Sequence, residues 1–106
     1  MPENAENRVI SLMTMCRRAG MLLLGFDAVK DAAVRGQMTV ILLAADVSPK
    51  TEKEIRFLAK DIPIRKTVTT MDAFAMFFRK RTAVFGVSDS GFAKKFLELL
   101  PESENV

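Results

Sequence analysis

Hydrophobic residues follow two alternating patterns along this chain, namely stripes at helical spacing and short continuous runs. The clearest pair lies between Gly25 and Asp46. Gly25 provides a flexible turn and Asp27 a side-chain oxygen that can cap free backbone N–H groups, so a helix is predicted to begin there and to end at Gly36. The apolar run 40–45 then predicts a strand that is covered on both faces. We place this strand at the centre of the sheet.

Each predicted helix carries an apolar stripe that should face the core. The stripe residues are Val9, Leu12, Met13, Cys16 and Ala19 in the first helix, Phe26, Val29, Ala33 and Gly36 in the second, Ile55, Leu58 and Ala59 in the third, Phe74, Phe77 and Phe78 in the fourth, and Phe92, Phe96, Leu97, Leu99 and Leu100 in the last. Ser48, Thr70 and the turn 88–91 supply caps for the last three helices. Further strands are predicted in the runs 21–24, 62–65 and 83–87. Pro63 places its strand at an edge of the sheet or at its own first residue, because proline cannot donate to a ladder.

Helical and extended segments alternate over the whole length, which is typical of an α/β protein. We predict a three-layer α/β/α sandwich with a small central sheet. The sequence has 106 residues, of which 49% are apolar, so it can bury one core. Residues 1–106 are therefore expected to form a single domain, with frayed ends at residues 1–4 and 101–106.

The composition excludes several kinds of chemistry. The chain has no histidine and one cysteine, so disulfide scaffolds, the usual zinc sites and Ser-His or Cys-His catalysis are not expected. We therefore expect no metal, no cofactor and no catalytic residues. No apolar run reaches the ~20 residues of a membrane-spanning helix, and residues 1–7 lack the features of a signal peptide. A cytoplasmic protein is the expectation.

Charged residues give a weak indication of the partner. Lysine and arginine number 16 against 13 acidic residues, a net charge of +3 that mildly favours polyanions. Asp27 and Asp31 lie one helical turn apart and are best interpreted as exposed acids. The helix start at Gly25 offers free N–H groups to an anion, with a phosphate backbone as a natural ligand. The cations that could add to such a site are Arg17, Arg18, Lys30, Arg79, Lys80 and Arg81. An ordinary solvated surface remains the alternative for each of them.

Several stretches of the chain match one protein superfamily when they are taken together and in order. They are Arg18-Ala19-Gly20, Gly25 through Arg35-Gly36, the run 40–45 followed by Asp46, and Ser88-Asp89-Ser90-Gly91-Phe92-Ala93-Lys94-Lys95. This pattern resembles the ribosomal protein superfamily of L-seven-Ae and L-thirty-e, with its small bacterial YlxQ-like branch as the closest match. The resemblance covers residues 8–100. It implies a four-stranded mixed sheet in a three-layer fold, and RNA binding without catalysis, typically to kink-turns or similar internal loops.

The resemblance also implies where RNA would bind. In that superfamily the RNA surface combines the glycine turn and start of the second helix with the loop before the last strand. The corresponding residues here are Gly25, Asp27, Ala28, Lys30, Asp31, Arg79, Lys80 and Arg81. Kink-turn binders typically carry Asn, Glu and Lys where this chain has Asp27, Ala28 and Asp31, so an amide donor, a polar atom and a cation are lost. The basic loop favours phosphate contact over packing of apolar residues.

The sequence therefore predicts a non-enzymatic RNA-binding protein that is associated with the ribosome or with translation and binds structured, kink-turn-like RNA. The expected partners are ribosomal or other structured RNA and ribosomal or translation proteins, without DNA or a membrane. Two alternatives stay open. One is a protein-interaction or scaffold domain that kept the fold but lost kink-turn recognition, as Asp27, Ala28 and Asp31 would permit. The other is a small-molecule or nucleotide-binding domain that uses the helix start at Gly25.

Overall fold

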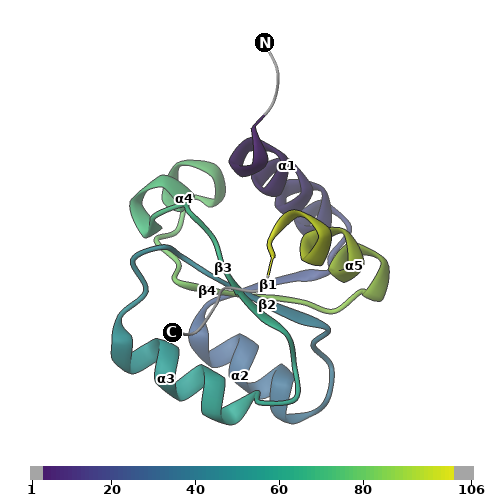
Figure 1. Ribbon diagram of the computed structural model, residues 1–106, viewed down its shortest axis with the longest axis vertical. Coiled ribbons are helices and arrows are strands. Elements are labelled where there is room, and N and C mark those ends of the chain that lie inside the picture. The colour runs from purple at the N-terminus through teal and green to yellow at the C-terminus, as the bar shows by residue number, and fades with distance from the viewer. Residues whose placement is uncertain (1–3, 102–106) are drawn as a thin grey trace.

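The computed structural model of the protein describes residues 4–101. Five helices and four strands alternate along this part of the chain. Their bounds are α1 (Ala5–Arg18), β1 (Leu22–Leu24), α2 (Phe26–Val34), β2 (Val40–Leu43), α3 (Pro49–Leu58), β3 (Ile64–Lys66), α4 (Met71–Phe78), β4 (Val84–Val87) and α5 (Ser90–Leu99). Helices α1, α4 and α5 cover one face of the sheet, and α2 and α3 cover the other (Figure 1). The predicted three-layer α/β/α fold is confirmed.

The central sheet is mixed and has four strands in the order β1-β4-β2-β3. Strand β4 is antiparallel to both of its neighbours, β1 and β2, whereas β2 and β3 are parallel. All four residues of β2 are buried, as predicted for a central strand. Because β1, β2 and β3 run in the same direction, they all end at the side of the sheet where β4 begins. Helices α2, α3 and α4 therefore all start at that end.

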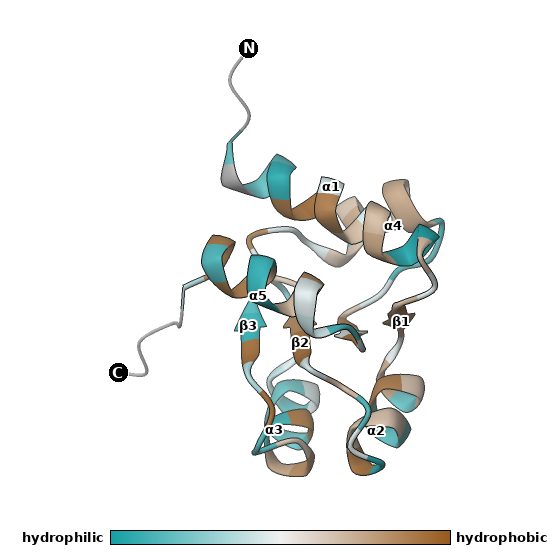
Figure 2. Ribbon diagram, turned by 90° about the vertical axis from the view of Figure 1, so that its right-hand side faces the viewer, coloured by the Kyte–Doolittle hydropathy of each residue, from teal (hydrophilic) through white to brown (hydrophobic). Residues whose placement is uncertain are grey.

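The strands differ slightly from their predicted bounds. Strand β3 begins at Ile64 rather than at residue 62, because Pro63 contributes only its carbonyl, which accepts from the N–H of Ile41 at 2.9 Å. It lies at the edge of the sheet, as the proline required. The other three strands are each one or two residues shorter than predicted. Figure 2 shows that β1 and β2 are hydrophobic, whereas one end of β3 is polar.

A core rich in phenylalanine joins α1, α4 and α5 to the sheet. Phe74, Phe85 and Phe96 are fully buried there, and the ring centroids of Phe74 and Phe85 are 4.6 Å apart. Cys16 is in the same core with an exposed fraction of 0%. Burial, with a smaller effect from the charge of Asp89, raises the pKa of the Cys16 thiol to about 11. Cys16 is thus a packed core residue that stays protonated at neutral pH.

A second core joins α2 and α3 to the opposite face of the sheet through residues such as Val29, Ile41 and Ile55. Gly86, in β4, lies beneath α2. A Cβ added to Gly86 would collide with the sulfur of Met38 and would lie 3.2 Å from the methyl groups of Val29. The lack of a side chain at Gly86 therefore allows α2 to lie close to the sheet.

Four residues that were predicted to face the core are exposed instead. Ala19 is the C-cap of α1 and Gly36 follows the C-cap of α2, so both lie beyond the turns that pack on the sheet. Leu58, which is 36% exposed, is the last residue of α3. Phe77 is 54% exposed because it lies about 100° around α4 from Phe78, which occupies the core.

Side-chain caps are present at the three helix starts where the sequence predicted them, namely at Ser48, at Thr70 and in the turn 88–91. Ser48, Thr70 and Asp89 each accept a hydrogen bond from the backbone N–H three residues ahead. Asn4 does the same for α1 by accepting from the N–H of Asn7 at 2.8 Å. Asn4, which the sequence placed in a frayed end, thus acts as the N-cap of α1. The same expectation covers Pro101, which follows the C-cap of α5, and residues 1–3 and 102–106, which lie outside the described residues.

Candidate functional site

The end of the sheet where β1 stops and β4 starts brings together the two segments that the sequence analysis singled out. Gly25 follows β1 directly, and its N–H donates to the carbonyl of Val84 at 2.8 Å. A Cβ built on Gly25 would lie 3.9 Å from the ammonium nitrogen of Lys80. Lys80 therefore lies against the start of α2, although it belongs to the loop after α4. This juxtaposition forms the centre of the candidate site.

The start of α2 has backbone donors without a side-chain acceptor. Gly25 is the N-cap, with φ 105° and ψ 148°, a conformation that is accessible to glycine and very few other residues. It offers no side-chain oxygen, and the structure shows no side-chain cap for this helix. The prediction that Asp27 caps α2 is wrong, because Asp27 lies inside the first turn. The positive end of the α2 dipole thus meets the Lys80 ammonium, an arrangement suited to an anion.

The outer face of α2 carries the next group of predicted site residues. Asp27, Ala28 and Asp31 are all exposed, and their spacing places them on one side of the helix. Lys30 lies partly buried beside them, with its ammonium 5.7 Å from the centroid of the Phe26 ring. This cation–π contact holds the Lys30 side chain back along α2. The exposed side of α2 therefore carries two carboxylates, those of Asp27 and Asp31.

The loop of residues 79–82 has a defined conformation. Arg79 ends α4 in the left-handed region with φ 60°, and its N–H donates to the carbonyl of Ala75 at 2.8 Å. The hydroxyl of Thr82, which is buried, donates to the carbonyl of Lys80 at 3.1 Å. These two bonds fix the backbone on both sides of Lys80. The Arg79 and Lys80 side chains are exposed, as a phosphate-binding loop requires.

Arg81 is engaged by a carboxylate. Its Nε donates to the Asp72 carboxylate at 2.7 Å, and this bond raises the pKa of the guanidinium, with a further contribution from Asp46. Asp46 in turn accepts from the N–H of Met71 at the start of α4, at 2.9 Å. Sequence reasoning missed both carboxylates. A first-turn acid such as Asp72 is detectable from sequence, but its pairing with Arg81 depends on how the loop folds back.

The two predicted cations of α1 differ in their surroundings. The Arg17 guanidinium is 5.5 Å from the centroid of the Phe78 ring and donates to the Phe78 carbonyl at 3.2 Å. Arg17 therefore braces the C-terminal end of α4, a structural role that its spacing on α1 did not reveal. Arg18 is exposed at the other end of the sheet, next to the turn that leads into β1.

Two further properties apply to the part of the chain that the structure describes. Within residues 4–101, no helix is long and apolar enough to cross a membrane. The same residues contain no group of three or more His, Cys, Asp or Glu side chains placed to hold a metal ion.

Solved structures of other proteins share this architecture. No protein-family model matches the chain. A structure of a Bacillus halodurans protein of unknown function superposes with a TM-score of 0.79 at 28% identity, covering 88% of this chain and 96% of that one. The 15.5kD RNA binding protein of Giardia lamblia gives a TM-score of 0.73 at 14% identity, covering 93% of this chain and 87% of that one. The chain therefore has the α/β fold of these two proteins.

Sequence comparison identifies a relative that aligns with nearly the whole chain. The RNA-binding protein YlxQ of Enterococcus faecium is 28% identical over 103 residues, which cover 94% of this chain and 98% of the relative. The resemblance to the YlxQ-like branch that the sequence motifs indicated is thus confirmed over nearly the whole length.

Proposed function

We propose that this chain is a non-enzymatic RNA-binding protein that acts in the cytoplasm, in association with the ribosome or with translation. One observation carries the proposal: the Lys80 ammonium lies against Gly25, at the one described helix start that has no side-chain cap. Backbone donors, a helix dipole and a cation converge there on a space that an RNA phosphate can occupy. The name of the Enterococcus faecium relative supports RNA as the ligand.

Each site residue has a separate role in binding a structured, kink-turn-like RNA. Gly25 and Lys80 hold a phosphate, Arg79 adds an exposed cation, and Lys30 supplies positive charge behind the first turn of α2. Arg81 reaches RNA only when it exchanges Asp72 for a phosphate. Ala28 leaves space for a base or ribose on the outer face of α2. The resulting surface acts as a single-domain binding module.

A rival function follows from the exposed carboxylates. Asp27 and Asp31 repel phosphates, so the same fold can serve as a protein-interaction or scaffold domain that no longer recognises kink-turns. A basic segment of a partner protein would be attracted to this face of α2. The two functions predict opposite responses to charge reversal at Lys80, because the protein-interaction surface would lose a repulsive cation rather than a phosphate contact.

The test is binding of a labelled kink-turn RNA and of a plain duplex of equal length across a salt series. We expect tighter binding of the kink-turn, and about a ten-fold loss of affinity at low salt for Lys80→Glu, because each lost phosphate contact removes one counterion-release term. Lys53→Glu on α3 is the matched control, since it makes the same charge change at an exposed residue outside the proposed site. If Lys80→Glu binds RNA as tightly as Lys53→Glu does, the site assignment is wrong. If the unaltered protein binds neither RNA, the RNA-binding function itself is refuted and the protein-interaction function takes its place.

A further inference from the structure

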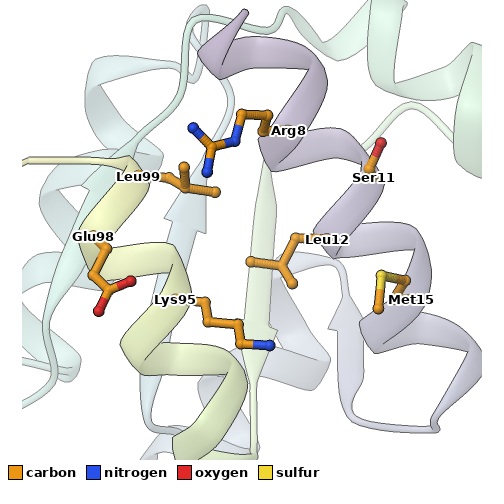
Figure 3. Close-up of a pocket in the computed structure, with 7 residues that line it drawn as sticks. All are labelled: Arg8, Ser11, Leu12, Met15, Lys95, Glu98 and Leu99. Carbon is orange, nitrogen blue, oxygen red and sulfur yellow. The ribbon is translucent and has the colours of Figure 1, made fainter. Parts of the chain in front are cut away.

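A groove between α1 and α5 forms a second candidate surface. It has a volume of about 510 Å³ and is lined by Arg8, Ser11, Leu12, Met15, Lys95, Glu98 and Leu99 (Figure 3). We call it the α1–α5 groove. It lies on the face of the sheet opposite to α2 and shares no lining residue with the site at Gly25 (Figure 1).

The two cations of the α1–α5 groove stand on facing helices. Arg8 and Lys95 are both exposed, and among residues 4–101 neither has a carboxylate within 4.0 Å. Figure 3 shows the Lys95 side chain extending toward α1 and the Glu98 carboxylate turned away from it. Ser11 adds an exposed hydroxyl on α1. The groove therefore presents hydrogen-bond donors with positive charge on both walls.

The basic character of this region extends beyond the groove. Helices α1 and α5 carry five basic residues, Arg8, Arg17, Arg18, Lys94 and Lys95, and two acidic ones, Glu6 and Glu98. Their excess of three positive charges equals the net charge of the whole chain, +3. The Glu6 carboxylate, moreover, accepts a hydrogen bond from the hydroxyl of Thr69 at 2.9 Å. The α1–α5 face thus carries a net excess of positive charge that attracts a polyanion.

We propose that the α1–α5 groove binds the sugar-phosphate backbone of a second segment of the RNA, which rests on the RNA-binding function proposed above. Arg8 and Lys95 contact phosphates from the two walls, and Ser11 donates to a phosphate or ribose oxygen. Met15, which is 55% exposed, provides an adaptable apolar contact for a ribose. A protein helix is the less suitable occupant, because Leu12 is buried and Met15 alone offers a strongly exposed apolar anchor.

The first test uses charge reversal and RNA length. The Arg8→Glu, Lys95→Glu double variant is compared with the Lys53→Glu, Lys60→Glu double variant, which makes the same charge change at exposed residues in and just after α3. A kink-turn RNA with long flanking stems should bind the groove variant at least ten-fold more weakly at ~100 mM salt, and the slope of log affinity against log salt should fall by about two contacts. The control should stay within two-fold of the unaltered protein, and circular dichroism checks that both variants fold. Equal losses in the two double variants would overturn the proposal.

The second test locates the RNA directly. Ser11→Cys can carry a photo-crosslinking group, because the native thiol of Cys16 is buried and is not modified in the folded protein. Lys53→Cys carries the same group on the opposite layer. We expect crosslinks to the long RNA from Ser11→Cys and none above background from Lys53→Cys. If Lys80→Glu weakens binding while Ser11→Cys gives no crosslink and the groove variant binds normally, the α2 site stands and the groove proposal fails. If the unaltered protein binds no RNA, both proposals fail together.

Discussion

Helices α2 and α4 start at the same end of the sheet, but only α4 has side-chain acceptors for the backbone N–H groups of its first turn. At α4, the Thr70 hydroxyl accepts from the N–H of Ala73 and the Asp46 carboxylate accepts from the N–H of Met71. The nearest loop cation, Arg81, is paired with Asp72. At α2, Gly25 supplies no acceptor and Lys80 stands beside the free donors.

This difference distinguishes a helix start with a purely structural role from one that can bind an external anion. The same positive dipole is present at both helices, but at α4 the protein's own oxygens occupy the donors, and at α2 they are left for an external anion. The presence of a helix start at this end of the sheet is therefore not enough to define a site. What defines it is the absence of a side-chain oxygen at the N-cap together with the position of Lys80.

The largest effect on this comparison is expected from Gly25→Ala. A Cβ at φ 105° strains the backbone by about 1–3 kcal/mol, and the strain falls on the residue that joins β1 to α2. The free energy of unfolding in urea should drop by that amount. Gly36→Ala is the matched control, since an added Cβ there has nothing within 4 Å and its φ of 74° is less restrictive. A loss at Gly25 that is no larger than the loss at Gly36 would contradict the assigned geometry.

Removal of the α4 cap should have a smaller effect that is confined to stability. Thr70→Ala leaves the N–H of Ala73 without its acceptor and should lower the free energy of unfolding by about 1 kcal/mol. Ser48→Ala at the start of α3 provides a parallel case with the same chemistry. RNA affinity should not change for either variant. A loss of RNA binding in Thr70→Ala alone would mean that the start of α4 belongs to the binding surface.

The smallest expected effect is a gain. Asp31→Lys replaces an exposed anion by a cation on the outer face of α2, so RNA affinity should rise several-fold and the salt slope should steepen by about one contact. Asp61→Lys makes the same charge change at an exposed residue before β3, at the other end of the sheet. Fluorescence anisotropy with the kink-turn RNA measures both. An equal gain in the two variants would indicate a general charge effect and remove Asp31 from the site.

The sequence predicted those features that depend on neighbouring residues. The caps at Ser48 and Thr70, and a cap within the turn 88–91, follow from side chains that reach the backbone three residues ahead. The buried strand β2 follows from a continuous apolar run. Asp27 has a suitable side chain for a cap, but Gly25 occupies the N-cap, so Asp27 lies two residues beyond it, inside the helix.

The features that the sequence left undetermined join distant segments through side chains. The pairing of Arg81 with Asp72 and the contact of Arg17 with Phe78 are set by how α4 and its loop pack, and neither has a periodic signal. The approach of Lys80 to Gly25 has the same origin. The resemblance to a superfamily predicted that the start of α2 and the loop 79–82 belong to one site. Residue spacing alone could not predict this.

Gly86 has a consequence for any attempt to transplant the site. Because Val29 and Met38 occupy the space that a side chain at Gly86 would fill, the height of α2 above the sheet is set from inside the core. Surface residues copied onto another α/β scaffold would reproduce the charges but not the position of the helix start relative to the loop. A graft of this site must therefore include a buried position without a side chain, which no comparison of surfaces would reveal.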